Sequence, residues 1–139
     1  MKLIDGRGAV LGRLGVFAAK EALRGEEITI LNCDQIIITG NKKSIEEDFK
    51  IKRGRTGSTM QGPRHHATSE KIVKRAIRGM LPNYREGRGK MALQRIKCFV
   101  GVPKEYEEKK LISLPKSKKI KFAEVREFTK QNGRNWKKI

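Results

Sequence analysis

The chain has 139 residues, and with 37% hydrophobic residues it is long enough to form one folded domain with its own core. Its 33 Lys and Arg residues outnumber the 15 Asp and Glu residues, which gives a formal net charge of +18. Because such a charge repels itself unless a polyanion neutralises it, we expect a nucleic acid as the partner. No apolar run approaches the roughly 20 residues that span a bilayer, and the first residues lack the apolar core of a signal peptide, so we expect no membrane partner.

The first third of the chain predicts an α/β unit. Residues 1–49 are nearly neutral, with 7 basic and 8 acidic side chains. A short strand that ends near Ile4 is followed by a glycine turn and by a helix over residues 11–25, whose apolar residues fall on one face. Residues 28–32 and 36–38 are rich in β-branched side chains and predict two buried strands. A strand, a helix and a strand in this order favour a parallel pair joined by a right-handed crossover.

The middle third carries most of the excess positive charge, because residues 50–97 contain 14 basic and only 2 acidic side chains. A helix that begins with Ser44 as its cap leads into a long glycine-rich loop over residues 52–66. This loop has almost no apolar anchors, so we expect it to become ordered on a phosphate backbone. A second helix with an apolar stripe and basic residues elsewhere on its surface runs over residues 69–81, and Pro82 ends it.

The last part of the chain predicts one more strand and then a basic extension. A glycine-broken basic turn over residues 84–90 leads towards a strand over residues 96–101, which we expect to close the sheet. We expect an α/β domain over residues 1–103, which carries the nucleic-acid-binding surface, and a basic C-terminal extension, residues 104–139, packed on or beside it. In the extension we expect a short amphipathic helix lined by Phe122, Val125 and Phe128.

An enzymatic function has little support in the sequence. Gly6, Gly8 and Gly12 precede a helix, as the glycines of dinucleotide-binding turns do, but their spacing departs from that pattern and the chain has no GK[ST] phosphate loop. The basic segment contains only Glu70 and Glu86 as carboxylates, and no nucleophile, base and orienting group come together. A nucleotide-using enzyme remains a rival hypothesis, but we expect no catalysis, no cofactor and no small-molecule substrate.

Two other groups of residues invite a metal or redox function. His65 and His66 are adjacent, but no other ligand lies near them in the sequence, so contact with a base or a phosphate is the better hypothesis. Cys33 and Cys98 form no CxxC motif, which favours buried free thiols in a reducing cytosol over a disulfide framework or a metal site.

Four segments together resemble the large-subunit ribosomal protein thirteen family, in its archaeal and eukaryotic branch. Arginines on glycine-rich loops already suit irregular folded RNA better than a regular DNA major groove. The resemblance is more specific, and it covers roughly residues 3–103 in the right order. It rests on VLGRLG at 10–15 followed by AK at 19–20, on Asn32 with ITGNK at 38–42, on RAIRGMLP at 75–82, and on residues 93–103 ending in GVP.

The resemblance implies a three-layer α/β/α sandwich around a small, mostly parallel four-stranded sheet, with basic loops and a C-terminal extension. It implies a non-catalytic, structural constituent of the cytoplasmic ribosome that binds large-subunit ribosomal RNA, meets neighbouring ribosomal proteins and supports assembly. A DNA- or tRNA-binding module outside the ribosome remains the other rival. Glycines 54, 57, 62, 87 and 89 would let the backbone approach RNA closely. On the matching positions we expect RNA contacts at Lys42, Lys43, Arg53, Arg55, Arg64, His65, His66, Lys74, Arg75, Arg78, Arg85, Arg88 and Lys90.

Overall fold

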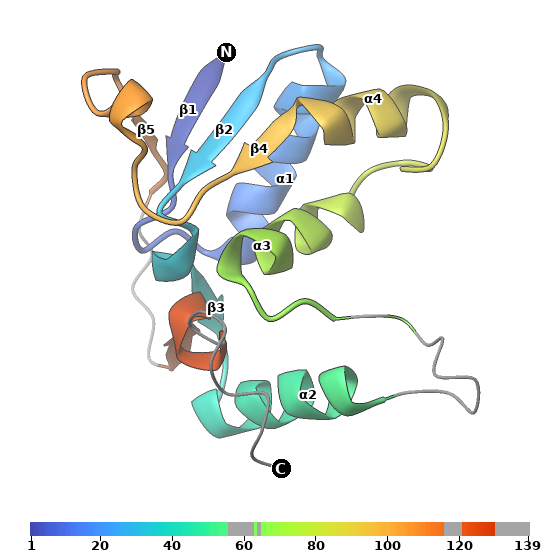
Figure 1. The fold of residues 1–139 in the computed structure, drawn as a ribbon, viewed down its shortest axis with the longest axis vertical. Helices are drawn as coiled ribbons and strands as arrows, with labels where there is room; N and C mark the ends of the chain where they lie inside the picture. Colours follow the sequence, from blue (N-terminus) through green and yellow to red (C-terminus); the bar gives the residue numbers. More distant parts are fainter. Residues whose placement is uncertain (56–62, 64, 116–120, 130–139) are drawn as a thin grey trace.

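A four-stranded, fully parallel sheet forms the centre of the computed structural model, which describes residues 1–55, 63, 65–115 and 121–129 (Figure 1). The strand order is β4-β2-β1-β5. The strands are β1 (Lys2–Asp5), β2 (Ile28–Leu31), β4 (Ile96–Cys98) and β5 (Ile112–Ser113). The predicted α/β class and the mostly parallel four-stranded sheet are confirmed, and the packing of helices on the sheet is consistent with the expected three-layer arrangement.

The predicted parallel crossover from β1 to β2 is also confirmed. Helix α1 (Leu11–Leu23) joins the two strands, which pair in parallel with Ile4 opposite Ile30. All four residues of β2 are buried, as its β-branched sequence predicts. On α1 the apolar spacing places Leu14, Ala18 and Ala22 in the core, where each is fully buried.

Helices α3 (Ser69–Arg78) and α4 (Gly87–Arg95) both pack against α1. The stripe predicted for α3 is buried, with Ile72, Val73 and Ile77 in the same core cluster as α1 and the sheet. The helix ends at Arg78, three residues earlier than expected, and the chain turns before Pro82. The core thus fixes α3 by its apolar side and leaves its basic side facing outwards.

Helix α2 (Lys42–Gly54) differs from the sequence prediction at both ends. Asn41, and not Ser44, caps it, because the Asn41 side chain accepts a hydrogen bond from the backbone N–H of Lys43 at 3.3 Å. The helix continues through Arg53, where a loop was expected. None of its residues is buried, and in Figure 1 it lies at the bottom of the view, away from the four-stranded sheet.

The C-terminal extension adds one strand to the four-stranded sheet and one to a second, two-stranded sheet, although a short amphipathic helix was predicted there. β5 pairs with β1, so the fourth strand of the main sheet comes from the extension. β6 (Phe122–Glu124) pairs antiparallel with β3 (Ile37–Thr39), which was expected in the main sheet. A 3₁₀ turn, η3 (Val125–Phe128), then follows, with Val125 buried. Two further 3₁₀ turns are η1 (Cys33–Gln35) and η2 (Lys104–Tyr106).

Candidate nucleic-acid interface

His65 lies in the segment that leads into α3, and charged residues of both α2 and α3 act on its side chain. Its side chain is half-buried, and this burial lowers the pKa of the imidazole below its usual value. The positive charges of Arg75, Lys52, Arg53 and His66 lower the pKa further. His65 is therefore a neutral imidazole at pH 7, able to donate and accept hydrogen bonds among cationic neighbours. Two segments far apart in sequence thus contribute charge to one place.

Arg53 lies in the last turn of α2 and is held by an aromatic ring of the same helix. Its guanidinium carbon is 5.8 Å from the centroid of the Phe49 ring, within the range of a cation–π contact. Burial lowers the pKa of Arg53, but a guanidinium stays charged in a protein. Because the side chain starts from a helix and not from a loop, its direction is defined before any ligand binds.

A second group of cations surrounds Tyr84, in the segment between α3 and α4. The guanidinium carbon of Arg78 is 4.7 Å from the centroid of the Tyr84 ring, and that of Arg85 is 5.7 Å from it. A hydrogen bond from Arg85 lowers the pKa of the Tyr84 hydroxyl, and the charges of Arg85, Arg78 and Arg75 add to this effect. Three guanidinium groups therefore act on one phenol.

Arg75 connects the two groups, because it acts on both His65 and Tyr84. Arg75 and Arg78 are three residues apart on α3 and so share one face of the helix. We call the set of residues that these charge effects connect, from the end of α2 through α3 to Tyr84 and Arg85, the basic strip. Its members are Lys52, Arg53, His65, Arg75, Arg78, Tyr84 and Arg85.

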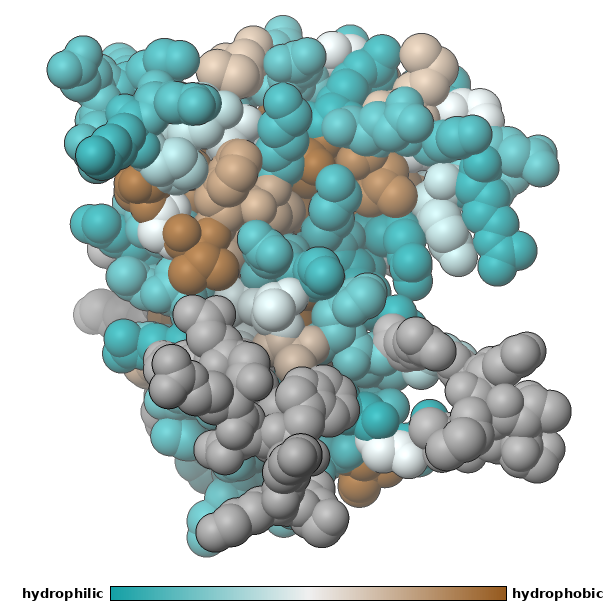
Figure 2. Space-filling view, viewed as in Figure 1, coloured by the Kyte–Doolittle hydropathy of each residue, from teal (hydrophilic) through white to brown (hydrophobic). Residues whose placement is uncertain are grey.

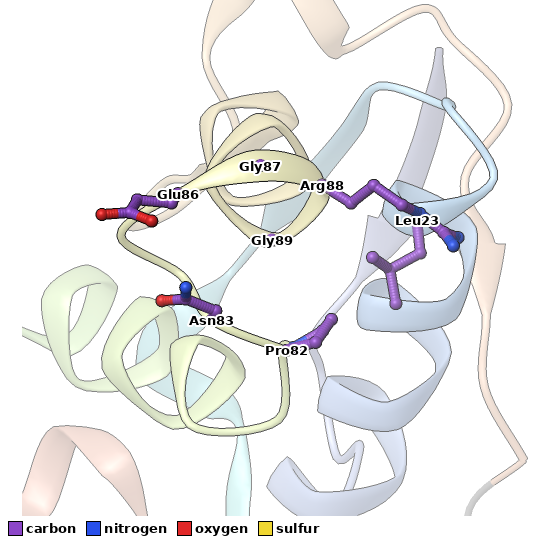
Figure 3. Close-up of a pocket in the computed structure, with 7 residues that line it drawn as sticks. All are labelled: Leu23, Pro82, Asn83, Glu86, Gly87, Arg88 and Gly89. Carbon is purple, nitrogen blue, oxygen red and sulfur yellow. The ribbon is translucent and has the colours of Figure 1, made fainter.

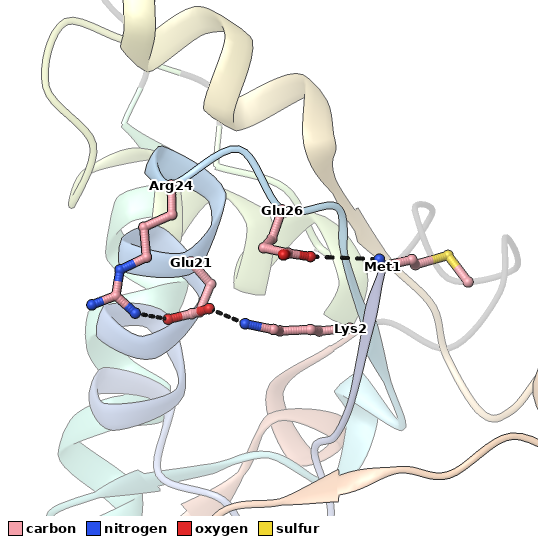
Figure 4. Close-up of polar contacts among 5 residues, drawn as sticks. All are labelled: Met1, Lys2, Glu21, Arg24 and Glu26. Carbon is pink, nitrogen blue, oxygen red and sulfur yellow. Dashed lines mark hydrogen bonds and ion pairs between the residues drawn. The ribbon is translucent and has the colours of Figure 1, made fainter.

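Acidic side chains neutralise basic ones in other parts of the molecule. Figure 4 shows Glu21, which is almost fully buried, held between Lys2 and Arg24, and Glu26 paired with the amino group of Met1 at 3.5 Å. Among the residues that the structure describes, by contrast, no salt bridge involves Arg78 or Arg85. Figure 2 shows hydrophilic side chains over much of this face, with apolar groups between them.

Several expected contact residues lie next to the basic strip. Lys74 is half-buried on α3, beside Arg75, and His66 is exposed beside His65. Arg55 is exposed directly after the end of α2. Arg64 lies outside the described residues. Lys52 and Tyr84 were not among the residues predicted from the sequence, although an aromatic residue next to an arginine, as in Tyr84-Arg85, is typical of RNA-binding surfaces.

Lys42 and Lys43 lie at the opposite end of α2 from the basic strip. Eleven residues of α-helix separate Lys42 from Arg53, or about 16 Å along the axis. The Lys42 amino group forms an ion pair with a carboxylate oxygen of Glu127 at 3.1 Å, so part of its charge is already neutralised by the extension. The structure does not bring these two lysines together with the arginines.

Arg88 and Lys90 belong to the first turn of α4 and not to a loop, as the sequence had suggested. Arg88 lines a shallow, open pocket together with other residues of the α1 end and the α3–α4 connection (Figure 3). Gly89 is buried there, and a Cβ built on it would lie 1.6 Å from the carbonyl oxygen of Pro82. This glycine therefore allows two parts of the chain's own backbone to touch, which corrects its expected role towards RNA.

The glycine turn before α1 serves the packing of the protein itself. A Cβ on Gly6 would lie 2.7 Å from the carbonyl oxygen of Leu31. The backbone N–H groups of Gly6 and Gly8 donate to the carbonyls of Leu31 and Gln35, at 2.9 and 3.1 Å. Because a nucleotide phosphate would need such N–H groups free, the turn does not support the nucleotide-binding hypothesis.

The two cysteines lie close together in the fold. A hydrogen bond with the Cys98 thiol is the main cause that raises the pKa of Cys33, and burial raises it further. Cys33 is fully buried, as expected, and both cysteines are free thiols. A protonated, buried thiol is a poor nucleophile and a poor metal ligand. In the described part of the chain, no three His, Cys, Asp or Glu residues are grouped for a metal ion, and no helix is long and apolar enough to cross a membrane.

Comparison with known proteins adds independent evidence. The family model described as ribosomal protein L13 matches residues 1–105. A protein of Methanococcoides burtonii is 39% identical over 114 residues, which cover 82% of this chain and 81% of that protein. One from Thermoplasma acidophilum is 43% identical over 111 residues, or 80% of each chain. One from Natronomonas pharaonis is 38% identical over 136 residues, or 96% of this chain and 91% of that protein. All three are named large ribosomal subunit protein uL13.

Proposed function

Because the chain belongs to the ribosomal protein L13 family, a family of structural and non-enzymatic constituents of the large ribosomal subunit, we propose that its basic strip binds large-subunit ribosomal RNA. By doing so it connects RNA segments during assembly of the subunit in the cytoplasm, beside neighbouring ribosomal proteins. The observation that carries this proposal is that cations of α2, α3 and the connection to α4 act on two neighbouring groups of side chains, at His65 and at the Tyr84 ring, and that Arg75 acts on both.

The chemistry of the basic strip suits a phosphate backbone. Arginine presents several N–H donors in a planar fork, which matches the oxygens of a phosphate group. The half-buried, neutral His65 offers a flat ring and hydrogen-bonding nitrogens for contacts with sugars or bases. Only Glu70 and Glu86 supply negative charge between residues 50 and 97, so the positive potential of this region is not cancelled locally.

The same proposal extends to residues beside the basic strip. Arg55, His66 and Lys74 border it, and Arg64, also an expected contact, falls between two of its segments in the sequence. Arg88 and Lys90 continue the positive charge onto α4. Lys42 and Lys43 would meet a different part of the RNA, because they lie at the other end of α2.

A test compares two variants with the same loss of charge. In the strip variant Arg53, Arg75, Arg78 and Arg85 are changed to Ala. In the control variant four exposed basic residues outside the strip and outside the expected RNA contacts are changed to Ala: Arg7, Arg13, Lys20 and Lys104. Binding of each full-length protein to a large-subunit rRNA transcript is measured against salt, with small-subunit rRNA, tRNA and duplex DNA as competitors.

In the plot of log affinity against log salt, we expect the slope of the strip variant to be smaller in magnitude than that of the wild type by about 3. Four arginines are removed, and each phosphate contact contributes roughly 0.7–0.9 to the slope. The control variant should keep most of the slope. Equal losses in both variants would show that only net charge matters and would overturn the proposal. Preference of the wild-type protein for tRNA or DNA would point to a function outside the ribosome.

A second experiment tests incorporation into the subunit. The native protein is expected to co-sediment with large ribosomal subunits at a stoichiometric level after a high-salt wash. A peripheral protein with 6–10 phosphate contacts would be removed, because such contacts lose roughly 10³–10⁵ in affinity between 50 and 200 mM salt. Recovery of the protein mainly in subunit-free fractions would contradict a structural role in the subunit.

A further inference from the structure

Tyr84 has an arrangement that the general charge of the basic strip does not explain. It is half-buried in the connection between α3 and α4, and the two guanidiniums that contact it come from different elements. Arg78 is the last residue of α3, whereas Arg85 follows Tyr84 directly and precedes α4. One aromatic ring therefore ties the end of a helix to the segment that leaves it.

The two arginines use different parts of the tyrosine. Arg85 donates a hydrogen bond to the hydroxyl oxygen, and its guanidinium carbon is 5.7 Å from the ring centroid. The guanidinium carbon of Arg78 is nearer to the centroid, at 4.7 Å, and its contact is with the ring. These distances hold the two guanidinium carbons within about 10 Å of each other, which is close to the Debye length of about 10 Å at 0.1 M salt.

Holding two like charges at this distance is unfavourable in the free protein unless something else compensates. Within the described residues neither guanidinium has a carboxylate partner, and the residues outside that part of the chain contain no Asp or Glu. The charge of Arg75 adds to the repulsion around Tyr84. An anion bound between Arg78 and Arg85 would remove it, and RNA phosphates are the anions that the proposed function supplies.

Arginine side chains are long and lose rotamer freedom when they bind a ligand. A contact that fixes them beforehand reduces this loss and raises affinity without adding a contact to the ligand. We propose that Tyr84 is a positioning residue, which holds Arg78 and Arg85 as a two-armed clamp for adjacent phosphates of one RNA strand. This inference rests on the proposed function and names the part of the strip where the backbone is gripped.

The arrangement also argues against the simpler role of Tyr84 as a platform for a base. Arg78 already lies on its ring, and the hydroxyl group is already used by Arg85. A base that stacked on Tyr84 in the same place would have to displace Arg78. The clamp and the platform make different predictions, because a clamp needs the arginines and a platform needs only the ring.

A double-mutant cycle separates the two roles. Affinity for the large-subunit rRNA transcript is measured for Tyr84→Leu and Tyr84→Phe, each in the wild-type chain and in the Arg78→Ala/Arg85→Ala background. We expect Tyr84→Leu to weaken binding by about tenfold and to lower the salt slope, although no charge is removed. Tyr84→Phe should lose only the share of RNA affinity that depends on the hydrogen bond with Arg85, because the ring that positions Arg78 remains. In the background without the two arginines, both changes should have less than about a twofold effect.

Tyr106 provides a matched control. Its ring also carries a cation, with the Lys109 amino group 5.2 Å from the centroid, but it lies at η2, outside the basic strip. Tyr106→Phe should leave RNA affinity and salt slope unchanged. Thermal unfolding of each variant verifies that the fold persists.

The outcomes distinguish failure of the clamp from failure of the proposed function. An equal effect of Tyr84→Leu with and without the arginines, or no effect in the wild-type chain, overturns the clamp while rRNA binding stands. If the wild-type protein shows no preference for large-subunit rRNA over the competitors, the proposed function and the clamp are both refuted.

Discussion

Gly89 offers the most direct test of how α4 and the preceding connection fit together. A Cβ at this position would lie 1.6 Å from the carbonyl oxygen of Pro82 and 2.7 Å from that of Asn83. An ordinary contact is at least 3.4 Å, and both neighbours are backbone atoms that no rotamer change can move. Replacing Gly89 with Ala must therefore displace α4 or residues 82–83 by about 2 Å.

The expected loss of stability follows from two opposing effects. Overpacking of a well-packed site costs about 1–3 kcal/mol, and a clash with backbone belongs at the upper end of that range. Alanine is better than glycine in a helix by up to about 1 kcal/mol, and by less in the first turn. The free energy of unfolding should fall by about 2–3 kcal/mol, which corresponds to a decrease in Tm of roughly 10 °C for a domain of this size.

Gly12→Ala is the matched control, since Gly12 also lies in the first turn of a helix but its Cβ would meet nothing within 4 Å. This change should stabilise the protein by about 0.5 kcal/mol, by propensity alone. Both variants are measured by urea and thermal unfolding in a buffer with enough salt to screen the net charge. A Gly89→Ala protein as stable as the wild type would refute the packing argument, and so would a loss as large in Gly12→Ala.

Two further predictions concern charges outside and inside the basic strip. The pKa of Glu21 is lowered, mainly by its hydrogen bond with Lys2, so its stabilisation is present above the unfolded-state value near 4.5 and is lost as the pH falls through the lower folded value. The Glu21→Gln variant should therefore have a lower free energy of unfolding than the wild type at pH 7, and this free energy should fall less between pH 7 and pH 3. Parallel stability curves over this range would argue against the ion pair. Arg78→Ala should lower the salt slope of rRNA binding by about 0.7–0.9 with the fold intact, whereas Lys42→Ala should change it less, because Lys42 is paired with Glu127. Equal slopes for these two variants, measured by filter binding, would contradict the assignment of Arg78 to the interface.

The elements that sequence predicts well are those whose buried residues form a regular pattern. β2 is apolar or β-branched throughout, and α1 and α3 have clear apolar stripes, so the crossover and the helix-bearing core follow from periodicity. α2 buries no residue and contributes only partly buried contacts through Ile45 and Phe49. Its sequence therefore contains little of the pattern that distinguishes the end of a helix from the start of a basic loop.

The extension and the start of α4 were predicted wrongly for other reasons. β5 has only two residues, too few for any alternation, and its place beside β1 depends on a pairing between residues more than 100 positions apart. β6 exists because its backbone pairs with β3, a contact that no local propensity encodes. Gly87 and Gly89 lower helix propensity, yet α4 begins there because Gly89 alone permits the close contact with Pro82.

For the candidate interface, the types of residue could be predicted from the sequence, whereas their grouping depends on the fold. Charge counting identified residues 50–97 as the basic region, but it treated every lysine and arginine as equivalent. The structure distinguishes them by partner: Lys42 is paired with an acid, whereas Arg78 lies on an aromatic ring. A cation on a ring keeps its full charge and a defined direction, so it remains available to an anionic ligand.

The distribution of acids shows why the chain folds in spite of its net charge. The acids that form ion pairs in the described residues lie in α1 and the turn after it (Figure 4) and in the extension, where Glu124 and Glu127 pair with Arg126 and Lys42. The basic side chains between residues 50 and 97 belong instead to helices and connections, and they lie on the sides of these segments that face away from the core. Repulsion is thus concentrated where a phosphate backbone would remove it, and binding should stabilise α2 and the α3–α4 connection more than the sheet. Hydrogen exchange of the protein with and without rRNA should show increased protection in these segments, and uniform protection of the whole chain would contradict this division.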